Sequence, residues 1–384
     1  MKKVALYPFN KITQGLIRFR DLLDFQIVSV IDFVFHSGED AGRVVEGQTC
    51  GIPIHRSMEE GLEQADTLIV NDPGTSFGGN KDVLEEHNLA SRWRELVRSA
   101  AAKGIKVVSV HEIYDADTID WLHDQRISIE VGNGFSRQLL NELDRKFDTS
   151  GTRIDNYLKQ FKNEALMFAV PKRIKRVGVF ATRGCIGKFT TQMNLYREFR
   201  NSGIAAAALI TEPTGFLFGQ PEGDIFKFLA HQSLEKYPYY IDAVTHQAER
   251  DGMEWIVMAG QSSILPTMNL VFNSVRFAML KVFDPQYNLL IVGYEDDAQI
   301  EAAIQLLSIY STRPAALLLP DKMETSYGRY EVFDREIRER RRDSLMSKFA
   351  IRTEFIEDAA RIKEWLLESD QSAGQREHTG IRNF

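Results

Sequence analysis

The amino-acid sequence predicts an α/β protein built from two domains, each with a parallel β-sheet. Short apolar runs alternate with amphipathic helical patterns along both halves of the chain. Between about residues 147 and 173 the strand pattern lapses, and polar and basic segments appear instead. The length of 384 residues leaves room for two domains of ordinary size. We therefore expect one parallel sheet before the interruption and a second one after it.

In the first half, β-rich runs are separated by helical patterns. The run that ends at Val110 follows a helical pattern stopped by Gly104, and it is continuously apolar, as a buried parallel strand should be. Such repetition is typical of a doubly wound sheet. Strands are expected at 4–7, 26–31, 67–70 and 106–110, and helices at 11–24, 57–64, 90–103 and 136–146.

The first strand lacks the glycine pattern of a dinucleotide-binding domain. After Ala5–Asn10 the chain passes directly to Lys11, without G-x-G-x-x-G. We therefore expect a Rossmann-like domain that does not bind NAD. The stretch Asn71–Asn80 follows a strand, where α/β sheets usually hold ligands, but turn chemistry alone also accounts for it. Both interpretations stay open.

A second series of strands and helices follows the interruption. Asp334–Arg342 interleaves acids with arginines, which predicts a solvated helix with ion pairs between successive turns; a surface for a partner or an acidic peptide is the lesser alternative. From residue 370 the sequence lacks apolar periodicity. The expected strands lie at 177–181, 205–210, 255–258, 289–292 and 315–319. The expected organisation is a Rossmann-like domain at 1–150, a linker at 151–172, a second domain at 173–369 and a mobile tail at 370–384.

The charge balance argues against a nucleic-acid partner. Lys and Arg number 47 against 54 Asp and Glu, which gives a net charge of −7. The apolar stretches are too short to span a bilayer, so no membrane association is expected. The chain has two cysteines and no basic and apolar leader before Val4, which indicates a cytoplasmic protein. The oligomeric state stays open, a homo-oligomer included.

The segment Arg176–Thr191 carries the clearest chemical signal. A buried-type strand is followed by a loop with glycines and then by a helical pattern that starts at Lys188. Backbone N–H groups in such a loop surround an anion, the helix N-terminus adds positive partial charge, and a lysine reaches the outer oxygens. The segment thus predicts a P-loop NTPase-like domain. Phosphate contacts are expected from Thr182, Arg183, Gly184, Cys185, Ile186, Gly187, Lys188, Phe189, Thr190 and Thr191.

This loop departs from the standard pattern G-x-x-x-x-G-K-[ST]. Thr182 replaces the first glycine, and Phe189 stands where a hydroxyl group would bind Mg²⁺. Thr190 is the candidate metal ligand in its place. Phosphate binding is therefore a firmer prediction than hydrolysis of a nucleoside triphosphate. The alternative is a tight turn whose lysine is only solvated.

The loop and two later segments resemble one protein family. Ala181–Thr191 resembles the motif G-T-x-x-x-V-G-K-M-T-T of the D-glutamate N-acetyltransferase family. Thr211–Gly215 looks like its T-G-Q-T-G, and Ala259–Pro266 looks like its E-G-Q-G-S-L-x-H-P. Arg183 occupies the place of an extra lysine in the related MinD-like enzymes. The opening Lys3–Asn10 is similar to a subgroup described as peptide maturation system proteins.

The resemblance implies a Rossmann-like domain followed by a phosphate-loop domain, but one acid of the family is missing. Ala259 stands where the relatives have Glu, so catalysis by analogy is in doubt. Glu212, Glu222 and Asp224 follow the strand that ends at Ile210 and are the candidates to replace it. An acid at such a position is more often a solvated loop residue than a base, and this alternative stays open for each of them. Gln261 and Ser262 are expected either to contact the ligand or to cap a helix.

The sequence therefore predicts a protein that binds a phosphate ligand, either ATP or another nucleotide with Mg²⁺, or acetyl-CoA. Lys188 would neutralise phosphate charge, and Glu212 or Asp224 would serve as base or metal ligand. The protein would assist group transfer or ligation on an amino acid or peptide, as a transferase or an ATP-dependent ligase in peptide natural-product maturation. The alternative is a non-catalytic nucleotide-binding partner in such a system, which the replacements Ala259 and Phe189 favour.

Overall fold

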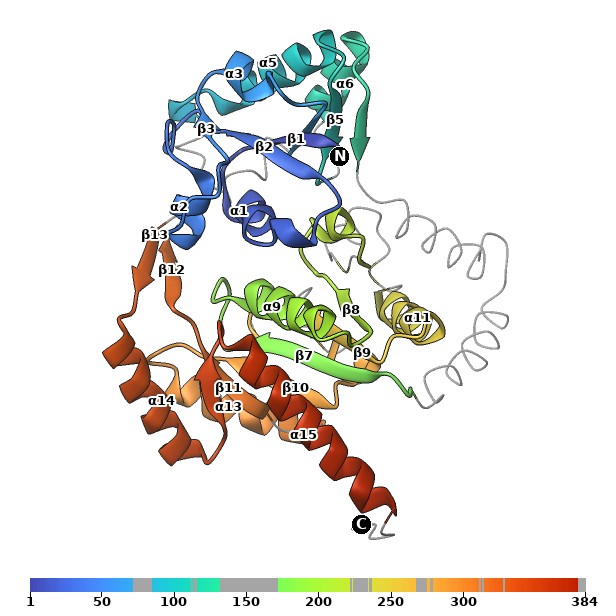
Figure 1. The fold of residues 1–384 in the computed structure, drawn as a ribbon, viewed down its shortest axis with the longest axis vertical. Helices are drawn as coiled ribbons and strands as arrows, with labels where there is room; N and C mark the ends of the chain where they lie inside the picture. Colours follow the sequence, from blue (N-terminus) through green and yellow to red (C-terminus); the bar gives the residue numbers. More distant parts are fainter. Residues whose placement is uncertain are drawn as a thin grey trace. The chain divides into compact units, whose positions relative to one another are not determined.

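The chain divides into two compact units (Figure 1). The first comprises Met1–Gln138, Glu212–Gln232 and Thr325–Arg329, and the second comprises the rest. The computed structural model describes residues 1–71, 85–111, 113, 116–131, 172–221, 223, 234, 237–266, 275–276, 279–310, 312, 314–326 and 329–378. The expected loop 72–80, the expected helix 136–146 and all of the expected linker except residue 172 lie outside these residues.

The first unit contains a six-stranded parallel sheet with the strand order β3-β2-β1-β4-β5-β6. This is the order of a Rossmann-like fold, and it confirms the predicted class. The four strands expected from the sequence are present, while the short edge strands β3 and β6 were not expected. The strands are β1 Lys3–Tyr7, β2 Gln26–Ile31, β3 Ile54–His55, β4 Thr67–Val70, β5 Lys106–Ser109 and β6 Ile129–Val131.

Helices cover both faces of this sheet (Figure 1). Helices α1 (Lys11–Arg18) and α2 (Ala41–Glu46) lie on one face, and α3 (Met58–Leu62), α5 (Leu89–Ala102) and α6 (Ala116–Asp124) lie on the other. The helix expected over 11–24 ends at Arg18 and gives way to a 3₁₀ turn at Arg20–Leu22.

The N-terminus of α1 is closed by its own sequence. The Asn10 side chain accepts hydrogen bonds from the N–H groups of Ile12 and Thr13, and the Thr13 hydroxyl accepts one from the N–H of Asn10. These amides serve the helix cap. This geometry agrees with the missing dinucleotide motif, because the helix does not offer these amides to a phosphate.

The second unit contains another six-stranded parallel sheet, ordered β14-β11-β10-β7-β9-β8. Its central strand β7 precedes the glycine-containing loop, as expected from the sequence. The edge strand β14 was not expected. The strands are β7 Lys175–Ala181, β8 Ala206–Leu209, β9 Trp255–Ala259, β10 Tyr287–Ile291, β11 Pro314–Leu319 and β14 Thr353–Phe355, with a separate pair β12 Lys322–Ser326 and β13 Arg329–Val332.

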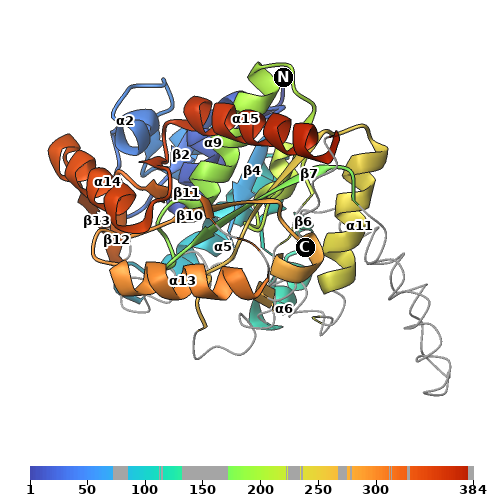
Figure 2. The same ribbon diagram turned by 90° about the horizontal axis from the view of Figure 1, so that it is seen from below.

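Helices also cover both faces of the second sheet (Figure 2). Helices α9 and α15 pack against each other on one face, and α13 lies on the opposite face. The helices are α9 Lys188–Asn201, α11 Tyr237–Arg250, α13 Asp297–Ile309, α14 Arg335–Phe349 and α15 Ala359–His378, with a 3₁₀ turn at Gly215–Phe218 and a π-helical turn at Met279–Phe283. No helix in the described part of the chain is long and apolar enough to cross a membrane.

Helix α15 extends into the C-terminal segment. The helix continues to His378, so residues 370–378 of the segment that was predicted to be a mobile tail are helical. Asp370 contributes to this, because its carboxylate lies 2.5 Å from Lys175 Nζ and accepts a hydrogen bond from the Tyr287 hydroxyl at 3.3 Å. A helix can thus extend beyond its apolar face where polar contacts continue to anchor it.

Candidate functional site

Four strand ends of the second sheet meet at one edge, because parallel strands all end on the same side. The loop between β7 and α9 begins at this edge, and the segments after β8, β9 and β10 leave from it. Hydrogen bonds tie these segments together. Thr182 N–H donates to Ile291 O at 3.0 Å, and Ile264 N–H donates to Ala181 O at 2.7 Å. The loop is therefore held by both neighbouring strands.

The loop contains two left-handed backbone conformations. Cys185 has φ +54°, and Gly187, the residue directly before α9, has φ +103°. A Cβ atom at Gly187 would lie 2.8 Å from Ile356 Cδ1, so the position favours glycine for two reasons. Ile186 between them is buried and anchors the loop to the core. These features bend the chain sharply between strand and helix.

The loop has the features of an anion-binding nest. No backbone carbonyl within the described residues accepts a hydrogen bond from the N–H groups of Gly184, Ile186 or Gly187. The half-buried Lys188 folds back over the loop, with its Nζ 3.5 Å from Arg183 O. The N-terminus of α9 adds positive partial charge at the same place. The arrangement can accommodate an anion such as a phosphate.

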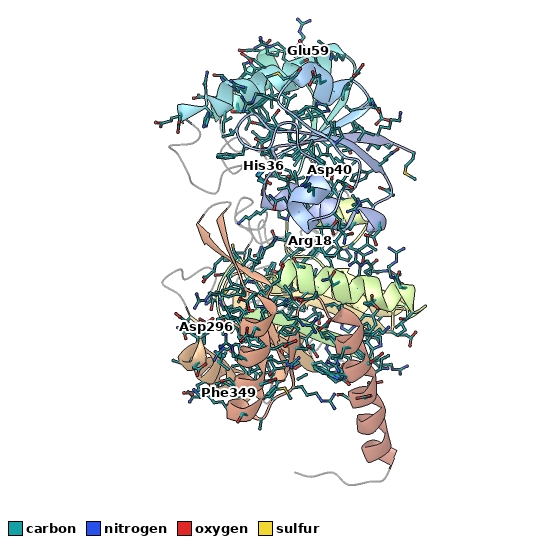
Figure 3. The ribbon with its side chains drawn as sticks, turned by 60° about the vertical axis from the view of Figure 1, so that its left-hand side comes forward. Arg18, His36, Asp40, Glu59, Asp296 and Phe349 are labelled. Atoms are coloured by element: carbon teal, nitrogen blue, oxygen red, sulfur yellow. The ribbon has the colours of Figure 1, made fainter. Side chains whose placement is uncertain are left out.

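The structure adds a residue that the sequence interpretation missed. Asp296, which is labelled in Figure 3, is fully buried and lies directly before α13. It forms an ion pair with Arg183. Its Oδ2 accepts a hydrogen bond from Thr182 Oγ1 at 2.5 Å. In the sequence, the signal for this residue is an acid that follows a strand, β10, and this strand lies beside β7 in the sheet. Strand order is needed to use this signal, and the sequence does not provide it.

Other residues expected at the loop take different positions. Thr191 is buried, and its N–H donates to Gly187 O at 2.9 Å in the first turn of α9. Phe189 and Thr190 are half-buried, whereas Cys185 is exposed. The described residues contain no group of three or more acidic, His or Cys side chains that could hold a metal ion. The role of Thr190 as a metal ligand stays a prediction.

The segment after β9 joins the ends of three strands. Ser263 Oγ donates to Thr182 O at 2.7 Å, and Gln261 Nε2 donates to Thr211 O at 2.7 Å. Gln261 Oε1 is buried and has no hydrogen-bond partner among the described residues. Ser262 is half-buried with φ +58°. Gln261 and Ser262 thus lie at the same edge of the sheet as the loop, and the Gln261 Nε2 group ties the segment after β9 to the segment after β8. Their contact with a ligand stays a prediction.

Among the described residues, the Glu212 side chain forms no hydrogen bond or ion pair with this group. Ala259, at the end of β9, is buried, so no carboxylate enters the site at that position. Glu212 belongs to a segment that is grouped with the first unit, and its carbonyl accepts a hydrogen bond from Gly215 N–H. Glu222 and Asp224 lie outside the described residues. The roles proposed for these acids stay predictions.

Comparisons with known proteins identify the domain that carries the loop. Residues 166–297 match a family model described as a domain of unknown function, the DUF1611 C-terminal P-loop domain. The whole chain is similar in structure to a crystal structure of a DUF1611 family protein from Anabaena variabilis, with a TM-score of 0.64 and 15% identity; the match covers 97% of this chain and 100% of that chain. No curated protein matches the sequence. The second unit therefore contains a P-loop domain, and the structural similarity supports the α/β fold of the described residues.

Proposed function

We propose that the loop from Thr182 to Lys188 binds the phosphate groups of a nucleotide or of coenzyme A. One observation carries the proposal: in a P-loop domain, the loop combines backbone N–H groups that no described carbonyl occupies with the N-terminus of α9 and the Lys188 ammonium group. These are donors and positive charges, and they fit phosphate oxygens. Bound ATP would supply an activating phosphate group, and bound acetyl-CoA would supply an acetyl group.

The expected acceptor is an amino acid or a peptide. The resemblance of the loop and of Ala259–Pro266 to the D-glutamate N-acetyltransferase family supports transfer to such a substrate. The similarity of Lys3–Asn10 to peptide maturation system proteins supports a role in making a peptide natural product. On this proposal the protein acts as a transferase or an ATP-dependent ligase.

A second candidate is a non-catalytic nucleotide-binding partner. Ala259 favours it, because this buried methyl group takes the place of a carboxylate at the strand end beside the loop. Phe189 favours it too, since it replaces the hydroxyl group that follows the lysine in the standard motif. Such a protein would bind phosphate without the acid that activates a nucleophile.

A thermal unfolding experiment with ATP, GTP and acetyl-CoA, each with and without Mg²⁺, tests both candidates. A ligand at 100 times its Kd stabilises the folded protein by about 2.7 kcal/mol, which is readily measured as a rise in Tm. Stabilisation that requires Mg²⁺ supports phosphotransfer or ligation, and stabilisation by acetyl-CoA alone supports acyl transfer. Stabilisation without turnover supports the binding partner.

Replacement of the loop lysine provides the site-specific test. We expect Lys188→Ala to weaken ligand binding by at least about tenfold, because a charge-assisted hydrogen bond to phosphate is lost. Lys281→Ala is the matched control, since Lys281 is an exposed lysine of the same unit. If no ligand raises the Tm, or if Lys188→Ala binds like the wild type, phosphate binding by this loop is ruled out.

A further inference from the structure

A buried carboxylate lies beside the phosphate loop and contacts it at two residues. The side chain of Asp296 has no solvent exposure. Its Oδ2 accepts hydrogen bonds from Thr182 Oγ1 at 2.5 Å and from Arg183 Nε at 3.1 Å, and its Oδ1 pairs with Arg183 Nη2. A buried carboxylate is costly unless such donors compensate it. The donors from Thr182 and Arg183 therefore compensate the buried charge of Asp296 in the folded protein.

The turn that carries Asp296 is itself firmly held. Gly293 N–H donates to Asp296 Oδ2 at 2.9 Å, and a Cβ atom at Gly293 would lie only 2.7 Å from the same oxygen. The Tyr294 hydroxyl donates to Pro320 O at 2.7 Å, and its ring stacks on Phe333 with centroids 3.7 Å apart. Burial raises the pKa of Tyr294 to about 12, so this hydroxyl remains a donor at neutral pH. Asp296 thus has a rigid support.

Arg183 keeps part of its binding capacity in this arrangement. Its side chain is 47% exposed, and Asp296 contacts only its Nε and Nη2 groups. A guanidinium group carries five N–H donors, so others remain for a ligand. Because Asp296 already restricts the side chain, less conformational entropy is lost when Arg183 contacts a phosphate.

We propose that Asp296 is a positioning residue for anion binding, which orients Arg183 and the start of the loop toward a ligand with two or more phosphate groups. This inference rests on the proposed phosphate binding by the loop. Arg183 adds a second side-chain cation to Lys188, which suits a ligand with more charge than a single phosphate. Asp296 would act through Arg183 and Thr182 without touching the ligand.

The positioning role and a purely electrostatic role of Asp296 predict opposite changes in anion affinity when the carboxylate is removed. If Asp296 contributed only its negative charge, Asp296→Asn would strengthen binding of an anion nearby, because a repulsion would be removed. If Asp296 positions Arg183, the same variant weakens binding, because the guanidinium group loses its fixed orientation. The direction of the change therefore separates the two roles.

The test measures binding of inorganic pyrophosphate and of ATP by calorimetry at low and at high salt. We expect Asp296→Asn and Arg183→Met each to weaken binding by about tenfold, as for one charge-assisted hydrogen bond. The double variant should be no weaker than the weaker single variant, because both changes remove the same interaction. The affinity should also depend less on salt in both single variants and in the double variant, and to the same extent, because each of them loses the contact between Arg183 and the ligand.

The adjacent acid provides a matched control. Asp297 pairs with Arg341 and Lys348 of α14, so Asp297→Asn should bind pyrophosphate like the wild type. If Asp296→Asn fails to fold, as judged by circular dichroism, Arg183→Lys keeps the charge but loses the two-point contact with Asp296. It should then bind as weakly as Arg183→Met, and wild-type affinity would overturn the proposal.

The outcomes distinguish failure of the proposed phosphate site from failure of the positioning role of Asp296. If neither pyrophosphate nor ATP binds the wild type, the proposed phosphate site fails. If both bind, and Lys188→Ala weakens them while Asp296→Asn binds equally well or more tightly, phosphate binding stands and the positioning role of Asp296 fails.

Discussion

At the scale of single residues, one buried ion pair stands apart from the phosphate loop. Lys172 Nζ lies 2.9 Å from Asp242 Oδ1, and their side chains are 7% and 2% exposed. His246 Nε2 lies 3.6 Å from Asp242 Oδ2. Burial lowers the pKa of Lys172, and the nearby Asp242 charge opposes this shift. The pair joins the segment before β7 to α11.

We expect Lys172→Met to destabilise the protein by about 3–5 kcal/mol, because it removes the ammonium group that compensates the buried Asp242 charge at the shorter distance. The measurement is the free energy of unfolding from urea titration. The exposed Lys103 serves as control, and Lys103→Met should change stability little. The double variant Lys172→Met, Asp242→Leu should recover most of the loss, since it removes both charges. A double variant as unstable as the single one contradicts this account.

At the scale of elements, the connection between β7 and α9 depends on Gly187. This residue has φ +103°, where a side chain is strained. Gly184 in the same loop has ordinary φ, and a Cβ atom there would meet no atom within 4 Å. The two glycines therefore allow the effect of backbone conformation to be measured within one loop.

Gly187→Ala should lower the free energy of unfolding by about 1–2 kcal/mol and weaken phosphate binding, because the left-handed conformation becomes costly. Gly184→Ala should leave stability nearly unchanged. Chemical denaturation and pyrophosphate titration give the two readouts. Adding Ile356→Val removes the Cδ1 atom 2.8 Å from the new methyl group and should relieve only the steric part. Equal stability of the two alanine variants would show that the loop does not need this backbone conformation.

At the scale of the whole molecule, each unit contains a carboxylate whose pKa lies below its usual value. In the second unit, hydrogen bonds from Lys348 and Arg341 lower the pKa of Asp297 from 3.8. In the first unit, burial raises the pKa of Asp40, but backbone N–H groups of Cys50 and Arg43 outweigh it and lower the pKa overall. Both carboxylates favour the folded state when they are ionised.

Acid should therefore weaken both units. The contribution of a carboxylate with a lowered pKa is present above its unfolded value, near 3.8, and is lost as the pH falls through the lower folded value. We expect the urea concentration at the midpoint of unfolding to decrease when the pH is lowered from 5 to 3. The variants Asp297→Asn and Asp40→Asn should each make this decrease smaller. Asp24→Asn, at an exposed position, is the control. If neither variant changes the pH dependence of the urea midpoint, ionisation of these two carboxylates does not contribute to stability as proposed.

Much of the fold follows from local sequence. The runs Leu68–Val70 and Pro314–Leu319 are apolar throughout and lie in strands close to where the sequence predicts them. The strands β3, β6 and β14 were missed because they have only two or three residues and carry no clear periodicity. Their pairing with longer strands stabilises them, and this is a tertiary effect.

The candidate site was predictable where its residues are consecutive. The loop from Thr182 to Lys188 is visible as a strand, glycines and a helix start, and the family comparison confirms that it lies in a P-loop domain. Asp296 lies 113 residues from Arg183, so its place beside the loop was not visible from the sequence. Sequence proximity to a strand therefore does not decide which side chains meet.

By itself, the sequence determined that this protein has two parallel-sheet domains and where the second one carries a phosphate loop, because periodicity and glycine placement act over a few residues. Only the tertiary structure decided that β10 lies beside β7, and that the carboxylate after β10 holds the arginine of the loop. Strand order is set by packing of the whole sheet, so contacts across it cannot be read from any local pattern.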